Sequence, residues 1–305
     1  MNIRKSAEVA AALASGTPVV ALESTITSKM GLPAPYNREC FDRVNAAIRA
    51  AGAVPAVTAV IDGELWAGIE PHHEALVLAA DEKLAERDLP VAMAAKRTGV
   101  TTVSATVTIA GLAGIGVFAT GGIGGVHRGA ELSFDVSSDL GAMSRHPVIV
   151  VSAGAKAFLD LPKTLEVLET LSVPVIGYQT SHFPAFWSRS SGLKIAHRVE
   201  TPDAIAATMN AARDAGWQGG LLIANPIPLA DEIPSAEIAA AIEHGLATAA
   251  AAGATGPAAT PRILAAIAAA TASRSIPANL ALAASNASLA AKVAVALSRL
   301  GGVRN

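Results

Sequence analysis

The chain of 305 residues has a single cysteine, Cys40, few aromatic residues and no excess of basic charge. One cysteine excludes an intramolecular disulfide and a zinc site built from several cysteines. A formal net charge of −2 provides no basic surface for nucleic acid. No run of about 18 uninterrupted apolar residues occurs, so we expect no membrane-spanning helix. We therefore expect a globular protein in the cytoplasm, which could still bind a phosphorylated metabolite through a few local cations.

The first residues predict a short capped helix rather than a signal peptide. Glu8 interrupts the apolar part of this segment, and the residues that follow read as a strand. Ser6 is a good N-cap residue, and Gly16 is suited to ending a helix. We therefore expect a helix over residues 6–15.

Strand-like and helix-like segments alternate along most of the chain. Hydrophobic residues make up 51% of it, but alanine supplies much of this share and aromatic residues only 4%, which favours helices packed through small side chains. The predicted strands are Pro18–Leu22, Val54–Ile61, Gly116–Ala119, Val148–Val151, Val173–Gly177 and Gly220–Ala224. Predicted helices between them are Asn37–Ala51, Leu84–Thr98, Lys163–Leu171 and Pro202–Ala215. This alternation predicts an α/β fold with a mostly parallel sheet sandwiched between helices (α/β/α).

The last quarter of the chain is alanine-rich and helical in pattern. We expect three helices there, over Ala236–Ala252, Pro261–Ala272 and Pro277–Leu300, which close over the sheet or pack between subunits. No repeat, low-complexity linker or clear boundary divides the chain. Residues 1–305 are therefore predicted to form a single domain.

Polar residues suited to catalysis or binding follow four of the predicted strands. Glu23, Thr120, Lys156 and Asn225 each come directly or shortly after an apolar run. Ligands of parallel α/β sheets bind beyond the carboxyl ends of the strands. We therefore expect the functional site at this edge of the sheet.

Lys156 and Glu23 are the candidate catalytic residues. Lysine is rarely buried without a reason, and a desolvated amine can add to an aldehyde to form a Schiff base. The alternative is a helix-end lysine that points to water. Glu23 lies at the end of a buried strand, where burial would suit its carboxyl group to general acid–base chemistry. It could equally cap the following turn or pair with an arginine.

Three carboxylates, Glu131, Asp135 and Asp139, are spaced four residues apart and would share one face of a helix. Such a face is either solvated or neutralised by a cation. The apolar neighbours of Asp135 argue against a plainly exposed face, and one or two carboxylates with waters commonly hold Mg²⁺ or Mn²⁺. His127 could join them as a ligand or be a hydrogen-bonded core histidine.

Glycines at positions 121, 122, 124 and 125 allow positive φ and can expose backbone amides that cradle an anion. The dinucleotide fingerprint is excluded because its third glycine position holds His127, and no Walker A sequence follows. Near the other end of the chain, Asn279 and Asn286 share one face of the last predicted helix. Their amides need partners, so either could reach a ligand.

Seven segments in collinear order resemble the pseudouridine-5′-phosphate glycosidase family. They are Val19-Val-Ala-Leu-Glu-Ser-Thr-Ile26, Phe118-Ala-Thr-Gly-Gly-Ile-Gly-Gly-Val-His-Arg-Gly-Ala-Glu131, Phe134-Asp-Val-Ser-Ser-Asp-Leu140, Ser152-Ala-Gly-Ala-Lys-Ala-Phe-Leu-Asp-Leu161, Pro174-Val-Ile-Gly-Tyr-Gln-Thr180, Phe183-Pro-Ala-Phe-Trp-Ser-Arg-Ser-Ser-Gly192 and Ala224-Asn-Pro-Ile-Pro228. Long motifs in this order are far more specific than any single signature above.

The resemblance implies a hydrolase that cleaves the C–C glycosidic bond of pseudouridine 5′-phosphate, reversibly, to uracil and ribose 5-phosphate. It further implies that Lys156 forms a covalent adduct with C1′ of the opened sugar, that Glu23 donates a proton and that Asp135 is associated with Mn²⁺ or another divalent ion. The implied substrate contacts are Lys83, Val103, Ser137, Ser138 and Asp139, with Thr120, His127 and Asn279 lining the pocket. The implied assembly is a homotrimer.

Two segments depart from the family pattern. Lys29-Met-Gly-Leu-Pro33 replaces the usual His-Gly and adds one residue, and Gly256-Pro-Ala-Ala-Thr-Pro-Arg-Ile-Leu264 lacks the usual lysine and glutamate. The changes at Lys29-Met30 and Pro257–Ala259 leave the catalytic pair intact but bear on base specificity and loop closure. Two other hypotheses stay open: a Schiff-base aldolase or lyase acting on a sugar phosphate, and an inactive homologue that binds a phosphometabolite.

Overall fold

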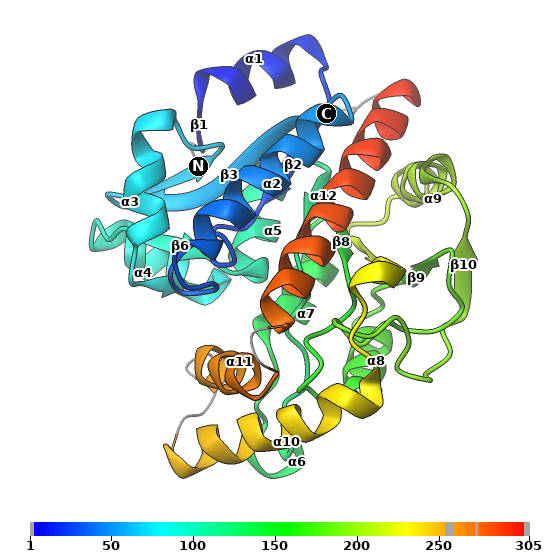
Figure 1. Cartoon of the computed structure of the whole chain (residues 1–305). Coiled ribbons are helices and arrows are strands. Elements are labelled where there is room, and N and C mark those ends of the chain that lie inside the picture. The colour runs from blue at the N-terminus through cyan, green and yellow to red at the C-terminus, as the bar shows by residue number, and fades with distance from the viewer. Residues whose placement is uncertain (1–2, 254–258, 272–273, 302–305) are drawn as a thin grey trace.

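The computed structural model describes residues 3–253, 259–271 and 274–301 (Figure 1). Its strands form an 11-stranded sheet with the order β1-β4-β3-β2-β7-β8-β11-β9-β10, to which β6 adds through β3 and β5 through β6. All pairs are parallel except β3 with β4 and β3 with β6. The strands are β1 Arg4–Lys5, β2 Val19–Leu22, β3 Val54–Ile61, β4 Glu64–Ala67, β5 Lys83–Leu84, β6 Gly99–Thr101, β7 Val117–Ala119, β8 Ile149–Ser152, β9 Val175–Tyr178, β10 His197–Val199 and β11 Leu221–Ala224.

The six predicted strands are confirmed, and all of them lie in the middle of the sheet. The other five strands were not predicted from the sequence, and each is only two to four residues long. One of them, β4, forms a hairpin with β3 through Asp62 and Gly63, whose φ values of 52° and 78° match the turn that such hairpins favour. Short edge strands carry no long apolar run, so hydrophobicity alone does not predict them.

Helices cover both faces of the sheet, as predicted. In Figure 1, α2, α9 and α12 lie on one face and α5 and α7 behind it. The longer helices are α1 Ala7–Ser15, α2 Tyr36–Ala50, α5 Val103–Ala113, α7 Ser138–Arg145, α8 Leu161–Thr170, α9 Pro202–Asp214, α10 Ser235–Ala251, α11 Ala259–Ala270 and α12 Ser275–Arg299. The short ones are α3 Glu74–Ala79, α4 Leu89–Ala94, α6 Ala130–Ser133 and the 3₁₀ turns η1 Pro71–His73, η2 Glu86–Asp88 and η3 Leu229–Asp231. The layers are therefore those of an α/β/α sandwich.

One predicted helix is wrong in most of its length. The segment Leu84–Thr98 begins in β5, continues through η2 and is helical only in α4. Lys83 and Leu84 pair with Val100 and Thr101 across the sheet, which a helix would prevent. The helix α5, by contrast, was not predicted, because nearly all its residues are buried and it shows no amphipathic period.

Both ends of the chain follow the predicted pattern. Ser6 caps α1 by accepting a hydrogen bond from the Val9 amide at 3.3 Å, and Gly16 ends it with a φ of 73°. At the other end, α10, α11 and α12 confirm the alanine-rich helical part, although Ala272 lies outside the described residues. By length and composition α12 could cross a membrane. However, 67% of its apolar 18-residue stretch is buried inside the protein, as in a core helix.

Candidate active site

A cavity of about 360 Å³ lies at the carboxyl ends of the strands. It is the place where the predicted site residues meet. Ten of the eleven line it: Glu23, Lys83, Val103, His127, Asp135, Ser137, Ser138, Asp139, Lys156 and Asn279. The eleventh, Thr120, donates a hydrogen bond from its hydroxyl group to the Glu23 carboxylate. Segments more than 250 residues apart in sequence, from Glu23 to Asn279, thus contribute to one cavity.

Glu23 is a buried carboxyl group placed directly after β2. Its side chain faces the cavity and is only 8% exposed as a residue. Burial raises the pKa of Glu23 to about 7, although the charges of Lys156 and Lys83 and the Thr120 hydroxyl lower it in part. A carboxyl group with a pKa near neutrality can both donate and accept a proton at physiological pH. Among the described residues no arginine contacts the carboxylate, so the structure does not show the arginine pair, and the acid–base role stays a prediction.

A buried network of hydroxyl groups holds the turn that follows Glu23. Ser24 Oγ accepts the Thr101 amide at 2.9 Å, and the Thr25 hydroxyl donates to the Thr101 carbonyl at 2.7 Å. Thr101 Oγ1 lies 2.7 Å from Thr58 Oγ1, which in turn lies 3.0 Å from Thr106 Oγ1. The network ties β2, β3 and β6 to the start of α5, and so fixes the backbone that carries the carboxylate.

Lys156 is half-buried and follows β8 through the small residues that the sequence singled out. Its backbone amide donates to the Ile123 carbonyl at 3.1 Å, which ties it to the glycine loop after β7. Gly154 has a φ of 79°, and a Cβ atom there would lie 2.3 Å from the Pro184 carbonyl oxygen. The loop therefore requires glycine at this position in order to bring the Lys156 amine into the cavity.

A second amine, that of Lys83, shares the cavity with Lys156. Burial and the nearby Lys156 charge lower the pKa of Lys83. Lys83 lies in β5 and lines the cavity, so it is not a solvated lysine on a helix surface. Two amines and the Glu23 carboxyl group thus face one small volume.

Asp139 has a structural role that the sequence did not show. One of its carboxylate oxygens accepts the Ser104 amide of α5 and the other accepts the Gly124 amide, both at 2.8 Å. Ser137 caps α7 by accepting the Asp139 amide at 3.2 Å, and its Oγ would lie 2.3 Å from a Cβ atom at Gly124. The Gly124 amide is thus bound by a carboxylate of the chain, so it does not contribute to the predicted anion cradle.

The three acidic residues do not share a helix face, which corrects the prediction. The helix α6 spans only Ala130–Ser133, and Phe134 leaves it with a φ of 55°. Glu131 therefore points outward to Lys163, 2.8 Å away, and Phe134 is 87% exposed despite its apolar character. Within residues 3–253, 259–271 and 274–301, no three His, Cys, Asp or Glu side chains are grouped in a way that could hold a metal.

Asp135 is the carboxylate that is predicted to be associated with a divalent ion. It lines the cavity, and one of its oxygens lies 3.8 Å from His127 Nδ1. Burial lowers the pKa of His127, which favours the neutral imidazole that metals bind. One carboxylate, with or without an imidazole, and several waters make a reasonable site for Mn²⁺ or Mg²⁺.

The two asparagines of α12 have different positions. Asn279 lines the cavity, and its Oδ1 accepts the indole N–H of Trp187 at 2.7 Å. Asn286 is fully buried outside the cavity, where it bonds to Asn225 and to the carbonyl group of Thr120. Of the two predicted ligand-binding amides, the structure places only Asn279 at the site.

Sequence reasoning missed several side chains that line the cavity, among them Arg87, Phe158 and Phe186. Arg87 lies in the segment that was predicted as a helix, and the two phenylalanines lie within motifs of the resemblance. Of the departures from the family pattern, Met30 lines the cavity and Lys29 pairs with Asp81 at the surface. Leu264 of α11 also lines the cavity, whereas residues 257 and 258 lie outside the described part of the chain.

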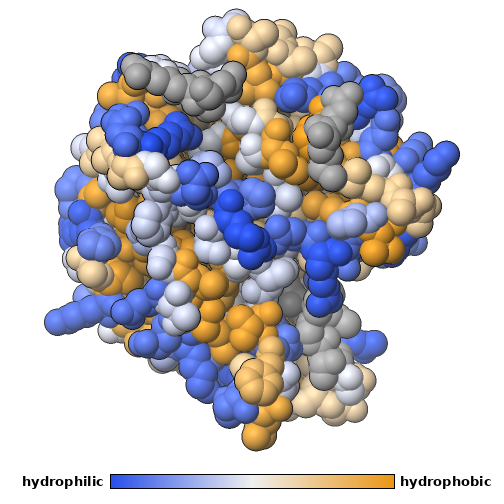
Figure 2. Space-filling model, turned by 180° about the vertical axis from the view of Figure 1, so that it is seen from behind, coloured by the Kyte–Doolittle hydropathy of each residue, from blue (hydrophilic) through white to orange (hydrophobic). Residues whose placement is uncertain are grey.

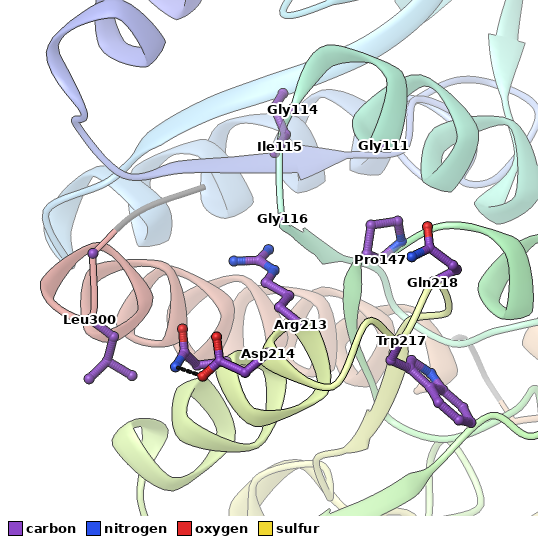
Figure 3. A pocket seen from close by; sticks show the side chains of 12 residues that line it. Gly111, Gly114, Ile115, Gly116, Pro147, Arg213, Asp214, Trp217, Gln218 and Leu300 are labelled. Atoms are coloured by element: carbon purple, nitrogen blue, oxygen red, sulfur yellow. Dashed lines mark hydrogen bonds between the residues drawn. The ribbon is translucent and has the colours of Figure 1, made fainter. Parts of the chain in front are cut away.

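A larger cavity, of about 530 Å³, lies at the opposite edge of the sheet (Figure 3). It is lined by the residues that precede β7 and β8 and by the C-terminal ends of α5, α9 and α12. Among the described residues that line it, Arg213 is the one cation, and burial lowers the pKa of this guanidinium. The ends of three helices carry partial negative charge that a half-buried arginine offsets. Because the described residues of this cavity include no acid–base group with a neighbouring lysine amine, the smaller cavity is the candidate active site.

Comparison with known proteins gives consistent results. A family model described as indigoidine synthase A like protein matches residues 8–296. The pseudouridine-5′-phosphate glycosidase of Methylobacterium nodulans is 53% identical over 292 residues, which cover 95% of this chain and 86% of the relative. Among solved structures, the prealnumycin C-glycosynthase AlnA in complex with ribulose 5-phosphate matches with a TM-score of 0.89 and 36% identity, covering 98% of this chain and 97% of that one.

An indigoidine synthase A-like protein from Thermotoga maritima also has this fold, with a TM-score of 0.87, 34% identity and 97% coverage of both chains. The matches extend over nearly the whole chain and include every strand of the sheet's centre. The resemblance inferred from the motifs is thereby confirmed: the chain belongs to the indigoidine synthase A like family, among relatives named pseudouridine-5′-phosphate glycosidase.

Proposed function

We propose that this protein cleaves the C–C glycosidic bond of pseudouridine 5′-phosphate, reversibly, to give uracil and ribose 5-phosphate. The observation that carries the proposal is the buried Glu23 carboxyl group in the same small cavity as Lys156. Relatives of about half-identical sequence, named for this activity, support the choice of substrate. The ribulose 5-phosphate complex of AlnA supports a five-carbon sugar phosphate as the ligand of this fold.

Lys156 is proposed as the nucleophile. Its amine adds to C1′ and loses a proton while the C1′–O4′ bond opens and O4′ gains one, which leaves a secondary amine on the opened sugar. The nitrogen lone pair then forms an iminium as the C1′–C5 bond breaks, and the bonding electrons remain on the uracil carbon. Water adds to the iminium carbon, and release of the Lys156 amine leaves ribose 5-phosphate.

Glu23 is proposed to give its proton to the uracil carbon as that bond breaks. A carbon leaving group cannot depart by protonation of a bridging oxygen, so an acid placed beside the carbon is required. The proton comes from a carboxyl group whose pKa of about 7 keeps much of it protonated at neutral pH. In the reverse reaction the Glu23 carboxylate would take the same proton back.

The remaining cavity residues are proposed to bind and orient the substrate. The Lys83 ammonium would pair with the 5′-phosphate, and Asn279 can donate through its amide nitrogen because its oxygen is bound to Trp187. Val103, Ser137 and Ser138 would contact the sugar phosphate. Asp135, with His127, would hold Mn²⁺ or a similar ion, which when bound supplies a positive charge that orients the substrate.

The assembly is proposed to be a homotrimer, as in the family that the motifs resemble. Figure 2 shows apolar surface at the foot of the molecule, where Figure 1 places α6. Leu132 and Phe134 in this segment are 88% and 87% exposed. Light scattering coupled to size-exclusion chromatography would give the mass, and Phe134→Glu should lower it if this surface packs against another copy. The cytoplasmic location stays a prediction.

Uracil release from pseudouridine 5′-phosphate in the presence of Mn²⁺ tests the proposal. We expect release by the wild-type protein and its loss in Lys156→Ala and Glu23→Ala. A protein that binds ribose 5-phosphate but releases no uracil would instead be a phosphometabolite-binding homologue. Cleavage of a ketose phosphate into two carbonyl products would identify an aldolase.

A further inference from the structure

Asn286 is a fully buried amide of α12 that lies among apolar residues. Its side chain is fully buried, and its helical neighbours toward the sheet include Leu282, Ala283 and Ala290. A polar group in such a place costs stability unless it is fully hydrogen-bonded. The contacts of Asn286 therefore show what it holds.

The amide links the carboxyl ends of two strands. Its Nδ2 donates to the Thr120 carbonyl at 2.8 Å and to the Gly121 carbonyl at 3.3 Å, and its Oδ1 accepts from Asn225 Nδ2 at 2.8 Å. Asn225 follows β11 and is itself anchored, because its backbone amide donates to the Ser152 carbonyl at 2.8 Å. Carbonyl oxygens only accept hydrogen bonds, so the orientation of the Asn286 amide is fixed by its partners.

Thr120 transmits this contact to Glu23. The Thr120 amide donates to the Val151 carbonyl of β8 at 3.0 Å, and its carbonyl group accepts from Asn286, so its peptide units are held on both sides. A β-branched side chain has little freedom about χ1, so the backbone position determines where the hydroxyl lies. That hydroxyl donates to the Glu23 carboxylate.

We propose, on the basis of the function proposed above, that Asn286 is a positioning residue that holds the Thr120 hydroxyl against the Glu23 carboxylate. It lies outside the cavity and acts through Thr120. The other groups that face Glu23 are the Lys156 and Lys83 ammoniums, the Asp139 carboxylate and the buried Cys40 thiol. Loss of Asn286 leaves those four groups in place, removes the restraint on Thr120 and also releases the Gly121 carbonyl and the Asn225 amide, neither of which contacts Glu23.

The Thr120 hydrogen bond favours the charged form of Glu23, so loosening it raises the pKa of the carboxyl group. Infrared difference titration of the whole protein measures this directly, with Glu23→Gln identifying the band of the protonated carboxyl group. For Thr120→Val we expect the midpoint to rise by roughly one pH unit, the size of a lost hydrogen bond to a carboxylate. For Asn286→Leu we expect a rise in the same direction and up to that size.

Ser285→Ala is the matched control, because Ser285 is the neighbouring residue on α12 and accepts from the same Asn225 amide without reaching Thr120. Its midpoint should equal that of the wild type. In the Thr120→Val background, Asn286→Leu should add no further shift, because its effect requires the hydroxyl group. If Asn286→Leu does not fold, Asn286→Ser is put through the same titration.

An unchanged midpoint in the folded Asn286 variant, or a shift that persists in the Thr120→Val background, would overturn the proposal. The titration needs no substrate, so it remains decisive even if uracil release is absent. In an active protein, the alkaline limb of kcat/KM for cleavage should move upward with the infrared midpoint. A purely structural role would lower the unfolding temperature without moving either quantity.

Discussion

Replacing Asp139 with alanine separates a structural role from direct substrate binding. Both carboxylate oxygens accept backbone amides at 2.8 Å, from Ser104 and Gly124, and the residue is 5% exposed. A hydrogen bond to a charged group contributes roughly 1.5–3 kcal/mol. Loss of both, partly offset by water that enters the space, should lower the free energy of unfolding by about 3 kcal/mol.

Urea denaturation followed by circular dichroism measures this change as a lower midpoint at an unchanged slope. Glu131→Ala is the control, because that carboxylate is exposed and pairs only with Lys163 in the described part of the chain, so its midpoint should stay close to that of the wild type. Asp139→Asn, which keeps one acceptor, should lie between the wild type and Asp139→Ala. A wild-type midpoint for Asp139→Ala, combined with weaker substrate binding, would show that Asp139 is a substrate ligand and not a structural anchor.

Three further predictions concern the cavity. The rate of cleavage should fall above a pH of about 7 as Glu23 loses its proton, whereas the rate of synthesis from uracil and ribose 5-phosphate should fall below that pH. The same pH dependence in both directions would contradict the acid–base role of Glu23. Lys83→Ala should raise KM for the phosphorylated substrate roughly tenfold with a smaller change in kcat, and Lys83→Arg should restore part of the affinity; a change in kcat alone would contradict a phosphate-binding role. Gly154→Ala should destabilise the protein by about 2 kcal/mol, because the φ at this position is 79° and the new Cβ atom would approach the Pro184 carbonyl group. It should also reduce activity strongly. A variant that unfolds at the same temperature as the wild type would refute this.

The centre of the fold was accessible from the sequence. The six central strands are apolar runs that are buried on both faces of the sheet. Their hydrophobicity and their alternation with helices along the chain are therefore enough to predict them. Their carboxyl ends then placed Glu23 and Lys156 at one edge. The structure places both side chains at one cavity, and that this cavity is the active site, with these chemical roles, stays a prediction.

What the sequence did not show depends on contacts between distant segments. The spacing of Glu131, Asp135 and Asp139 suggested one helix face, but the chain turns at Phe134, whose left-handed conformation no local pattern indicates. The interaction of Ser24 with Thr101 joins residues 77 apart, and that of Asn286 with Thr120 joins residues 166 apart. Such contacts follow from the topology of the sheet, which residue spacing does not specify.

The central claim is that Lys156 attacks C1′ in a cavity where Glu23 supplies the proton. Borohydride reduction during turnover of pseudouridine 5′-phosphate, followed by peptide mass mapping, tests it most directly. The account predicts a reduced sugar-phosphate adduct on the peptide that contains Lys156, and none in Lys156→Ala. Uracil release with no adduct on any lysine, or an adduct on Lys83 instead, would contradict it.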